Sequence, residues 1–150
     1  MLFDAIYQYH EICVNVARAV DLDYRALEVL MWIESRGNAT VISPAGAVGL
    51  MQVMPGEIIP GRPKKSELLC PQTNIYEGAK ILKHALVTFD GNYEKAIPAY
   101  FLGENGALNN EKYGKLKLGY LAEFVNVWRK MFSDYLPWET IPNGFQEGYE

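Results

Sequence analysis

The sequence predicts a mainly helical protein with one irregular lobe, rich in glycine, inserted after its second helix. Apolar residues recur at three- and four-residue steps in several segments, and that period is typical of one face of a helix. Residues 36–73 interrupt the pattern with frequent glycine and proline. The chain has 150 residues, 49% of them hydrophobic, which is enough for a single globular core. We therefore expect one domain over residues 1–136 and a short acidic, aromatic tail over residues 137–150.

Two helices are expected before the lobe. The first carries an apolar stripe that runs from Leu2 to Val20 along one helical face. The second begins after Asp23, a favourable N-cap residue, and continues to about Ser35. Gly37 then ends it.

The lobe is expected to contain little regular structure. Short strands or a small β-hairpin are expected around Val41 or over residues 48–53, and one turn of helix near Ser66. Such a long irregular segment is uncommon in a compact domain and is often functional. Its one basic cluster, GRPKK at Gly61 to Lys65, is expected to be a solvated loop because it contains glycine and proline.

Three helices are expected after the lobe, over about residues 74–91, 92–103 and 119–135. Apolar residues share one face in the first and the last of them. Pro98 lies inside the short middle helix and should kink it, because proline removes a backbone hydrogen-bond donor.

Charge and composition exclude several classes of protein. The net charge is −4 and the sequence pI about 5.2, so a basic surface that grips nucleic acid is not expected. No apolar run approaches the ~18 residues of a membrane-spanning helix. The opening MLFDAIYQYH lacks the basic start and the cleavage site of a signal peptide, so we expect a chain made in the cytoplasm.

The cysteines and histidines predict neither a metal site nor a cofactor site. Cys13 and Cys70 are expected to be free thiols in the absence of an export signal. His10 and His84 lie far apart and outside any metal-binding motif. We expect no metal, no cofactor and a monomer.

Glu34 is the main candidate for chemistry. It closes the nearly apolar run ALEVLMWIESRGN and shares a helical face with Leu27 and Met31. Burial of an unpaired charge is costly, and the usual response is a raised pKa. A glutamate whose pKa is raised to ~6 is a usable general acid. The alternative is a structural ion pair between Glu34 and Arg36 or Arg18.

Three segments resemble the soluble lytic transglycosylase family of the lysozyme superfamily. The first is the pair Glu34-Ser35 followed by SPAGAVGLMQVMP, which is highly specific. The others are CPQTNIYEGAKIL and AIPAYFLG, which would be weak alone. The resemblance covers about Asp23 to Gly103 and implies a lysozyme-like fold.

The resemblance also implies a set of site residues. Glu34 is expected to be the single catalytic acid and base, and Ser43, Gln52 and Tyr100 to orient the substrate. Glycine is expected to let the backbone approach a ligand closely, and the apolar residues to form a wall that desolvates Glu34; these residues are Gly49, Leu50, Met51 and Met54. The residues alone leave other roles open: core packing for the methionines, a turn for Ser43 and a buried core position for Tyr100.

The implied reaction is cleavage of the β-1,4 bond between N-acetylmuramic acid and N-acetylglucosamine, with formation of a 1,6-anhydro end. Most glycosidases use two carboxylates, and the motifs supply only one. The first alternative is a muramidase that hydrolyses the same bond, favoured if a second carboxylate holds a water near Glu34. The second is a catalytically weak module that binds or assembles cell wall.

Three positions depart from the family pattern. Phe101 replaces the asparagine that follows the tyrosine, Pro98 replaces a helix-forming alanine, and Cys70 replaces an aspartate. These changes concern the details of sugar binding more than the type of reaction.

The expected partner is the glycan strand of peptidoglycan. Because this acidic chain cannot rely on bulk attraction to an anionic wall, contacts inside the groove should supply most of the binding. We expect the protein to act in the periplasm or cell wall, delivered by a bacteriophage as a lysin or exported by other means.

Overall fold

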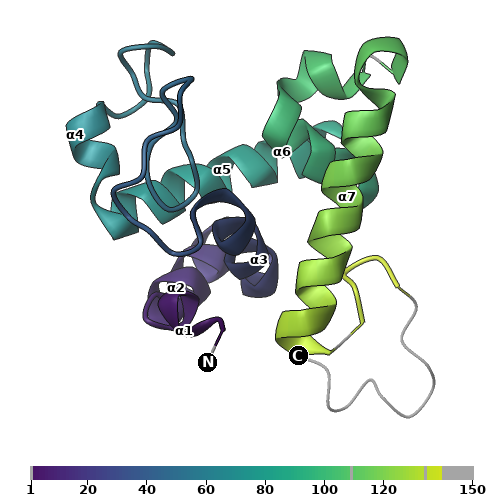
Figure 1. Ribbon diagram of the computed structural model, residues 1–150, viewed down its shortest axis with the longest axis horizontal. Coiled ribbons are helices and arrows are strands. Elements are labelled where there is room, and N and C mark those ends of the chain that lie inside the picture. Colours follow the sequence, from purple (N-terminus) through teal and green to yellow (C-terminus); the bar gives the residue numbers. More distant parts are fainter. Residues whose placement is uncertain (1, 109, 134, 140–150) are drawn as a thin grey trace.

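The computed structural model describes residues 2–108, 110–133 and 135–139 (Figure 1). These residues form seven helices: α1 (Asp4–Tyr7), α2 (His10–Val20), α3 (Tyr24–Ser35), α4 (Lys65–Leu68), α5 (Pro71–Thr88), α6 (Tyr93–Leu108) and α7 (Asn110–Phe132). The described residues contain no strand, and the expected β-hairpin is reduced to isolated bridges, Ile42 to Val48 and Val48 to Val53. The mainly helical prediction is confirmed.

Helix α5 runs through the middle of the fold. It packs on α2, α3, α4 and α6, while α3 also packs on α7. In Figure 1 the irregular lobe and α4 lie on one side of the molecule, and α6 and α7 lie on the other. Residues from both sides and from α3 and α5 meet in one core; its largest fully buried side chains include Leu27, Leu30, Met31, Leu50, Met51, Ile75, Leu82, Phe124 and Trp128.

The N-terminal region differs from the sequence prediction in two respects and agrees with it in one. The expected first helix is divided into α1 and α2, because the chain leaves helical geometry at Tyr9, with φ -102° and ψ 8°. Leu2, which was expected on the buried stripe, is exposed. Helix α3 begins as predicted, and the Asp23 side chain accepts a hydrogen bond from the Arg25 backbone N–H at 3.0 Å.

The C-terminal helices are longer than predicted. The departure from helical geometry in α6 lies at Gly103, with φ 73° and ψ 166°, rather than at the expected Pro98. Glycine adopts such a conformation at little cost, which explains the position of the break. Helix α7 begins at Asn110, well before the predicted Gly119, and ends before Ser133, whose φ is 49°.

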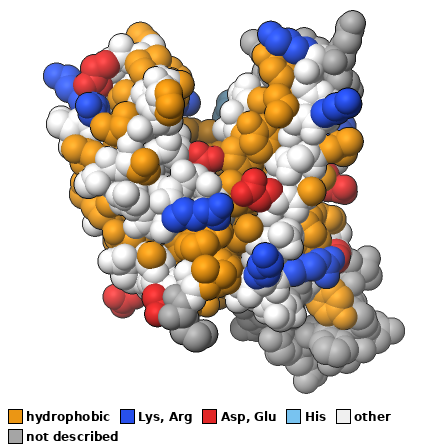
Figure 2. All heavy atoms as spheres, viewed as in Figure 1, with side chains coloured by type: hydrophobic (Ala, Val, Ile, Leu, Met, Phe, Trp, Pro, Cys, Tyr) orange, Lys and Arg blue, Asp and Glu red, His pale blue; other side chains and the backbone are white. Residues whose placement is uncertain are grey.

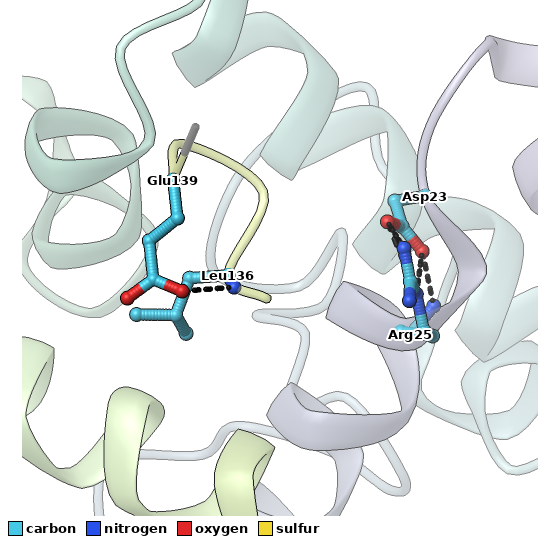
Figure 3. Close-up of polar contacts among 4 residues, drawn as sticks. All are labelled: Asp23, Arg25, Leu136 and Glu139. Carbon is cyan, nitrogen blue, oxygen red and sulfur yellow. Dashed lines mark hydrogen bonds and ion pairs between the residues drawn. The ribbon is translucent and has the colours of Figure 1, made fainter. Parts of the chain in front are cut away.

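The pair Asp23 and Arg25 fixes the start of α3 against α7. The Arg25 guanidinium bonds the Asp23 carboxylate with both Nε and Nη2 (Figure 3). The same guanidinium carbon lies 5.0 Å from the centroid of a Trp128 ring on α7. This arrangement holds in register the two helices that carry acidic side chains into the site described below.

The first residues of the predicted tail lie against the helical body. Glu139 pairs with Arg129 of α7 at 2.6 Å and accepts a hydrogen bond from the Leu136 backbone N–H at 2.9 Å (Figure 3). The Trp138 ring lies 6.1 Å from the Phe124 ring. The rest of the predicted tail, residues 140–150, lies outside the described residues.

Candidate active site

A cleft of about 650 Å³ opens between the lobe and the α6–α7 side. Figure 2 shows the molecule hollowed there, with hydrophobic side chains on both flanks and acidic side chains near the base. The lining includes five residues expected at a site, namely Glu34, Ser43, Gln52, Met54 and Tyr100. It also includes residues that the sequence did not single out, among them Arg62, Tyr120 and Glu123.

The end of α3 places Glu34 in this cleft. The Ser35 hydroxyl donates to the Met31 carbonyl at 3.1 Å and accepts from the Gly37 N–H at 3.2 Å, which terminates the helix. Gly37 has a φ of 82°, and a Cβ there would come within 2.8 Å of Ala5. Glycine is therefore required for the chain to turn sharply, directly after the glutamate, and pack on α1.

Glu34 is partly buried, and its pKa is raised from 4.5 to about 7. Desolvation by burial is the larger cause, because it disfavours the charged carboxylate. The negative charge of Glu123 on α7 is the second cause. Near neutral pH the carboxyl of Glu34 is therefore about half protonated, which suits a group that must first donate a proton and then accept one.

The alternative role for Glu34, a structural ion pair with Arg36 or Arg18, is not supported. The Arg36 guanidinium lies over the Trp32 ring, 4.8 Å from its centroid. Within the described part of the chain, neither Arg36 nor Arg18 forms an ion pair with Glu34.

Ser43 and Gln52 line the cleft from the lobe. The Ser43 hydroxyl accepts a hydrogen bond from the Ala47 N–H at 3.0 Å, so it stabilises a turn and keeps its own hydrogen for a ligand. The Gln52 amide nitrogen donates to the carbonyls of Val41 and Gly49 at 3.2 and 3.0 Å. Its carbonyl oxygen is then the atom that can accept a hydrogen bond from a sugar amide or hydroxyl.

Tyr100 connects α6 to the lobe. Its hydroxyl donates to the Met51 carbonyl at 2.7 Å. Burial, followed by the nearby charge of Glu34, raises the pKa of Tyr100, so the phenol stays neutral. A Cβ at Gly78 on α5 would lie 2.6 Å from the Met51 Cβ and 3.0 Å from the Tyr100 hydroxyl. The absence of a side chain at Gly78 allows this close packing.

Asn74 anchors the lobe on α5. Its side chain is fully buried and accepts a hydrogen bond from the Met51 N–H at 2.7 Å. It donates to the carbonyls of Val48 and Leu68 at 2.7 and 2.9 Å. A Cβ at Gly49 would come within 2.6 Å of the Asn74 amide nitrogen, so only glycine fits there. The segment CPQTNIYEGAKIL, which contains Asn74, therefore contributes to the site by holding the lobe in place. Asn74 itself does not line the cleft.

The predicted apolar wall is only partly present. Met54 lines the cleft, but Leu50 and Met51 are fully buried in the core and do not line it. Gly49 is also buried, and its role in the structure is to accommodate Asn74. Direct contact of these three residues with the substrate stays a prediction, and the structure places them in the core rather than in the lining of the cleft.

Two features of the opposite wall were missed. Glu123 of α7 faces the cleft from beside the predicted apolar face of its helix, and no local motif marks it. Phe101, one of the departures from the family pattern, stacks on Tyr120 of α7 with ring centroids 4.4 Å apart. Its apolar ring therefore joins the two helices of this wall.

The described residues hold no group of three or more histidine, cysteine or acidic side chains that could bind a metal ion. None of the helices in the described ranges is both long and apolar enough to cross a membrane. Cys13 is buried and Cys70 exposed, and both are free thiols as predicted.

The family profile described as "Transglycosylase SLT domain" matches residues 14–121, which is more than half of the chain. The chain belongs to the transglycosylase SLT domain family. The matched range includes Glu34, the whole lobe and Tyr100, and it ends just before Glu123.

Named relatives of this SLT domain agree with that assignment. The soluble lytic murein transglycosylase of Escherichia coli is 40% identical over 78 residues, which cover 47% of this chain and 12% of the relative. The endo-type membrane-bound lytic murein transglycosylase A of Klebsiella pneumoniae is 37% identical over 84 residues, covering 50% and 41%. The transglycosylase of Enterobacteria phage PRD1 is 34% identical over 104 residues, covering 67% and 37%. The chain thus spans less than half of these relatives.

Solved structures share the fold. The 70 kDa soluble lytic transglycosylase of Escherichia coli matches with a TM-score of 0.68 at 24% identity, over 84% of this SLT domain and 25% of that chain. The complex of the 70-kDa soluble lytic transglycosylase with bulgecin A matches with a TM-score of 0.60 at 28% identity, over 80% and 21%. The lysozyme-like fold expected from the sequence is thereby confirmed.

Proposed function

We propose that this SLT domain is a lytic transglycosylase that cleaves the β-1,4 bond between N-acetylmuramic acid and N-acetylglucosamine in peptidoglycan. The observation that carries the proposal is Glu34, partly buried near the end of α3 in a cleft of about 650 Å³, with a pKa of about 7. We propose that it acts as a monomer. The proposed place of action is the cell wall, reached by phage delivery or by export.

The proposed reaction uses Glu34 twice. The protonated carboxyl gives its proton to the glycosidic oxygen as the bond from that oxygen to C1 of N-acetylmuramic acid breaks. The N-acetyl oxygen of the same sugar stabilises the cationic C1, a form of substrate assistance. The Glu34 carboxylate then takes the proton of the 6-hydroxyl, and O6 bonds C1 to close the 1,6-anhydro ring. The carboxyl is protonated again, and no water is consumed.

The surroundings of Glu34 support these roles. Met54 on the lobe and Ile33 on α3 add apolar surface to the cleft and help exclude water from the carboxyl. Ser43 has a hydroxyl hydrogen to donate, and Gln52 has an amide oxygen to accept with. These groups are suited to the N-acetyl and hydroxyl groups of an amino sugar.

Mass spectrometry of digested cell wall tests the proposal. We expect fragments that end in 1,6-anhydro-N-acetylmuramic acid, and we expect the Glu34→Gln variant to release none. The matched control is Glu11→Gln, which makes the same change at an exposed glutamate on α2. Gln52→Glu is unsuitable as a control because it alters the site. A fully active Glu34→Gln variant would remove Glu34 from the mechanism.

A second candidate function is hydrolysis of the same bond. It is favoured by Glu123, a second carboxylate in the cleft whose charge acts on Glu34. Glu123 could hold a water for attack on C1, which would leave a reducing end that carries one additional water. Digestion in ¹⁸O-labelled water separates the two outcomes. Label in the new ends would establish hydrolysis, and its loss in Glu123→Gln would assign the water to Glu123.

A further inference from the structure

Arg62 stands between the cleft and a second hollow. The second hollow has a volume of about 330 Å³ and lies between the turn at Gly61 and helix α5, where it is lined by Glu77, Lys80 and His84. Arg62 and Ile81 line both hollows, so the two share a wall at these residues. The sequence suggested that the segment around Arg62 is only a solvated loop, but Arg62 is partly buried and faces the cleft.

Arg62 has no carboxylate partner among the residues that the structure describes. Its Nη1 donates to the Met54 carbonyl at 3.3 Å, and within the described residues no carboxylate pairs with it. The neighbouring Lys80 differs, because it pairs with Glu77 at 2.5 Å and lies over the Tyr76 ring. Among the described residues that line the cleft, Arg62 is the one lysine or arginine, and the two acidic side chains are Glu34 and Glu123.

An anionic substrate needs such a cation. The chain has a net charge of −4, and Glu123 and the ionised form of Glu34 repel a negative ligand in the cleft. Peptidoglycan is nevertheless negative, since the peptide stems on its N-acetylmuramic acid residues carry free carboxylates. The planar guanidinium of arginine presents paired donors that match a carboxylate. A cation in the wall of this cleft would hold the peptide stem of a sugar bound there.

We propose that Arg62 and the hollow beside it form a subsite for a carboxylate of the peptide stem on N-acetylmuramic acid. The glycan backbone occupies the cleft along Glu34, and the stem leaves it over Arg62 toward α5. This subsite rests on the proposed function, because it assumes that a peptidoglycan strand occupies the cleft. It gives the site a preference for strands with acidic stems over strands whose stems are amidated.

Binding is measured in the Glu34→Gln background, so that no ligand is consumed. The probes are purified peptidoglycan fragments free of teichoic acid, with stem carboxylates either free or capped as amides. We expect Arg62→Gln to weaken binding of the acidic fragment on the order of tenfold, as for one charge-assisted pair, and to leave binding of the amidated fragment unchanged. Arg62→Lys should lose less, because it keeps the charge.

Lys65→Gln is the matched control, since it removes the same charge from an exposed residue of the same segment outside the cleft. Equal affinity of the two fragments for the background protein would overturn the subsite without any variant at Arg62, so the test survives if Arg62→Gln folds poorly. Equal losses in Arg62→Gln and Lys65→Gln would also overturn it. Failure of every fragment to bind would overturn the proposed function as well.

Discussion

Tyr100 of α6 donates its hydroxyl hydrogen to the backbone carbonyl of Met51 in the lobe, at 2.7 Å across 49 residues of sequence. The two residues belong to opposite sides of the cleft, so this single bond helps set the distance between its walls. The resemblance predicted that Tyr100 orients the substrate. The bond to Met51 gives the same residue a second task, which is to hold the lobe.

The Tyr100→Phe variant should be less stable than wild type and should have a lower kcat. It leaves the Met51 carbonyl without this donor, and loss of one such bond costs about 1–2 kcal/mol of unfolding free energy. We expect kcat on cell wall to fall as well, because the lobe then positions Ser43 and Gln52 less well. Tyr76→Phe is the control, since it removes an exposed hydroxyl from α5. Wild-type stability and kcat in Tyr100→Phe would contradict both tasks.

Glu123→Gln should shift the pH dependence of activity toward acid. Glu34 must be protonated to begin the reaction, so kcat/KM should decline as the pH rises through about 7. The negative charge of Glu123 raises the pKa of Glu34, and its removal lowers that pKa. The midpoint of the decline therefore moves to lower pH in Glu123→Gln. The distant Glu11→Gln variant should keep the wild-type midpoint, and a midpoint that rises in Glu123→Gln would refute the assignment.

The features that could be predicted from sequence are those set by nearby residues. Helix α3 and its terminal Glu34 follow from the Asp23 cap, the apolar stripe and Gly37, all within one short segment. Arg62 and Glu123 were missed because each reaches the cleft only through tertiary packing, one from the lobe and one from α7. Neither residue has a local pattern that distinguishes it from an ordinary solvated charge.

The difference between the predicted apolar wall and the lining of the cleft has a similar origin. Residues in a family motif were expected to face the ligand, yet Leu50 and Met51 are fully buried in the core. Which side of an irregular lobe packs on the body depends on its anchor, here the buried Asn74 far along the chain. Periodicity cannot show this, because the lobe has no regular period.

Asn74→Ala should detach the lobe. It removes three hydrogen bonds and leaves the Met51 N–H without its partner, while the Val48 carbonyl keeps only the Val53 N–H. Loss of buried partners of this kind should cost about 3–5 kcal/mol of unfolding free energy, and activity should be lost with it. Denaturant unfolding measures the first effect, and turbidity of a cell-wall suspension the second. Gln72→Ala, at an exposed position in the same helical turn, should change neither, and a stable Asn74→Ala variant would show that the lobe is held by other contacts.

Glu34→Gln should be more stable than wild type at alkaline pH. The folded pKa of Glu34 is about 7, above its ordinary 4.5, so the folded state binds more protons than the unfolded state between these values. Stability then falls as the pH rises through that window, and the cost at pH 8 is about 1–3 kcal/mol. The glutamine variant escapes this cost, so its unfolding free energy should match wild type near pH 4 and exceed it at pH 8. If the unfolding free energies of wild type and Glu34→Gln, measured in urea, change in parallel between pH 4 and pH 8, Glu34 is well solvated in the folded state. That result would contradict its role as a partly buried general acid in the cleft.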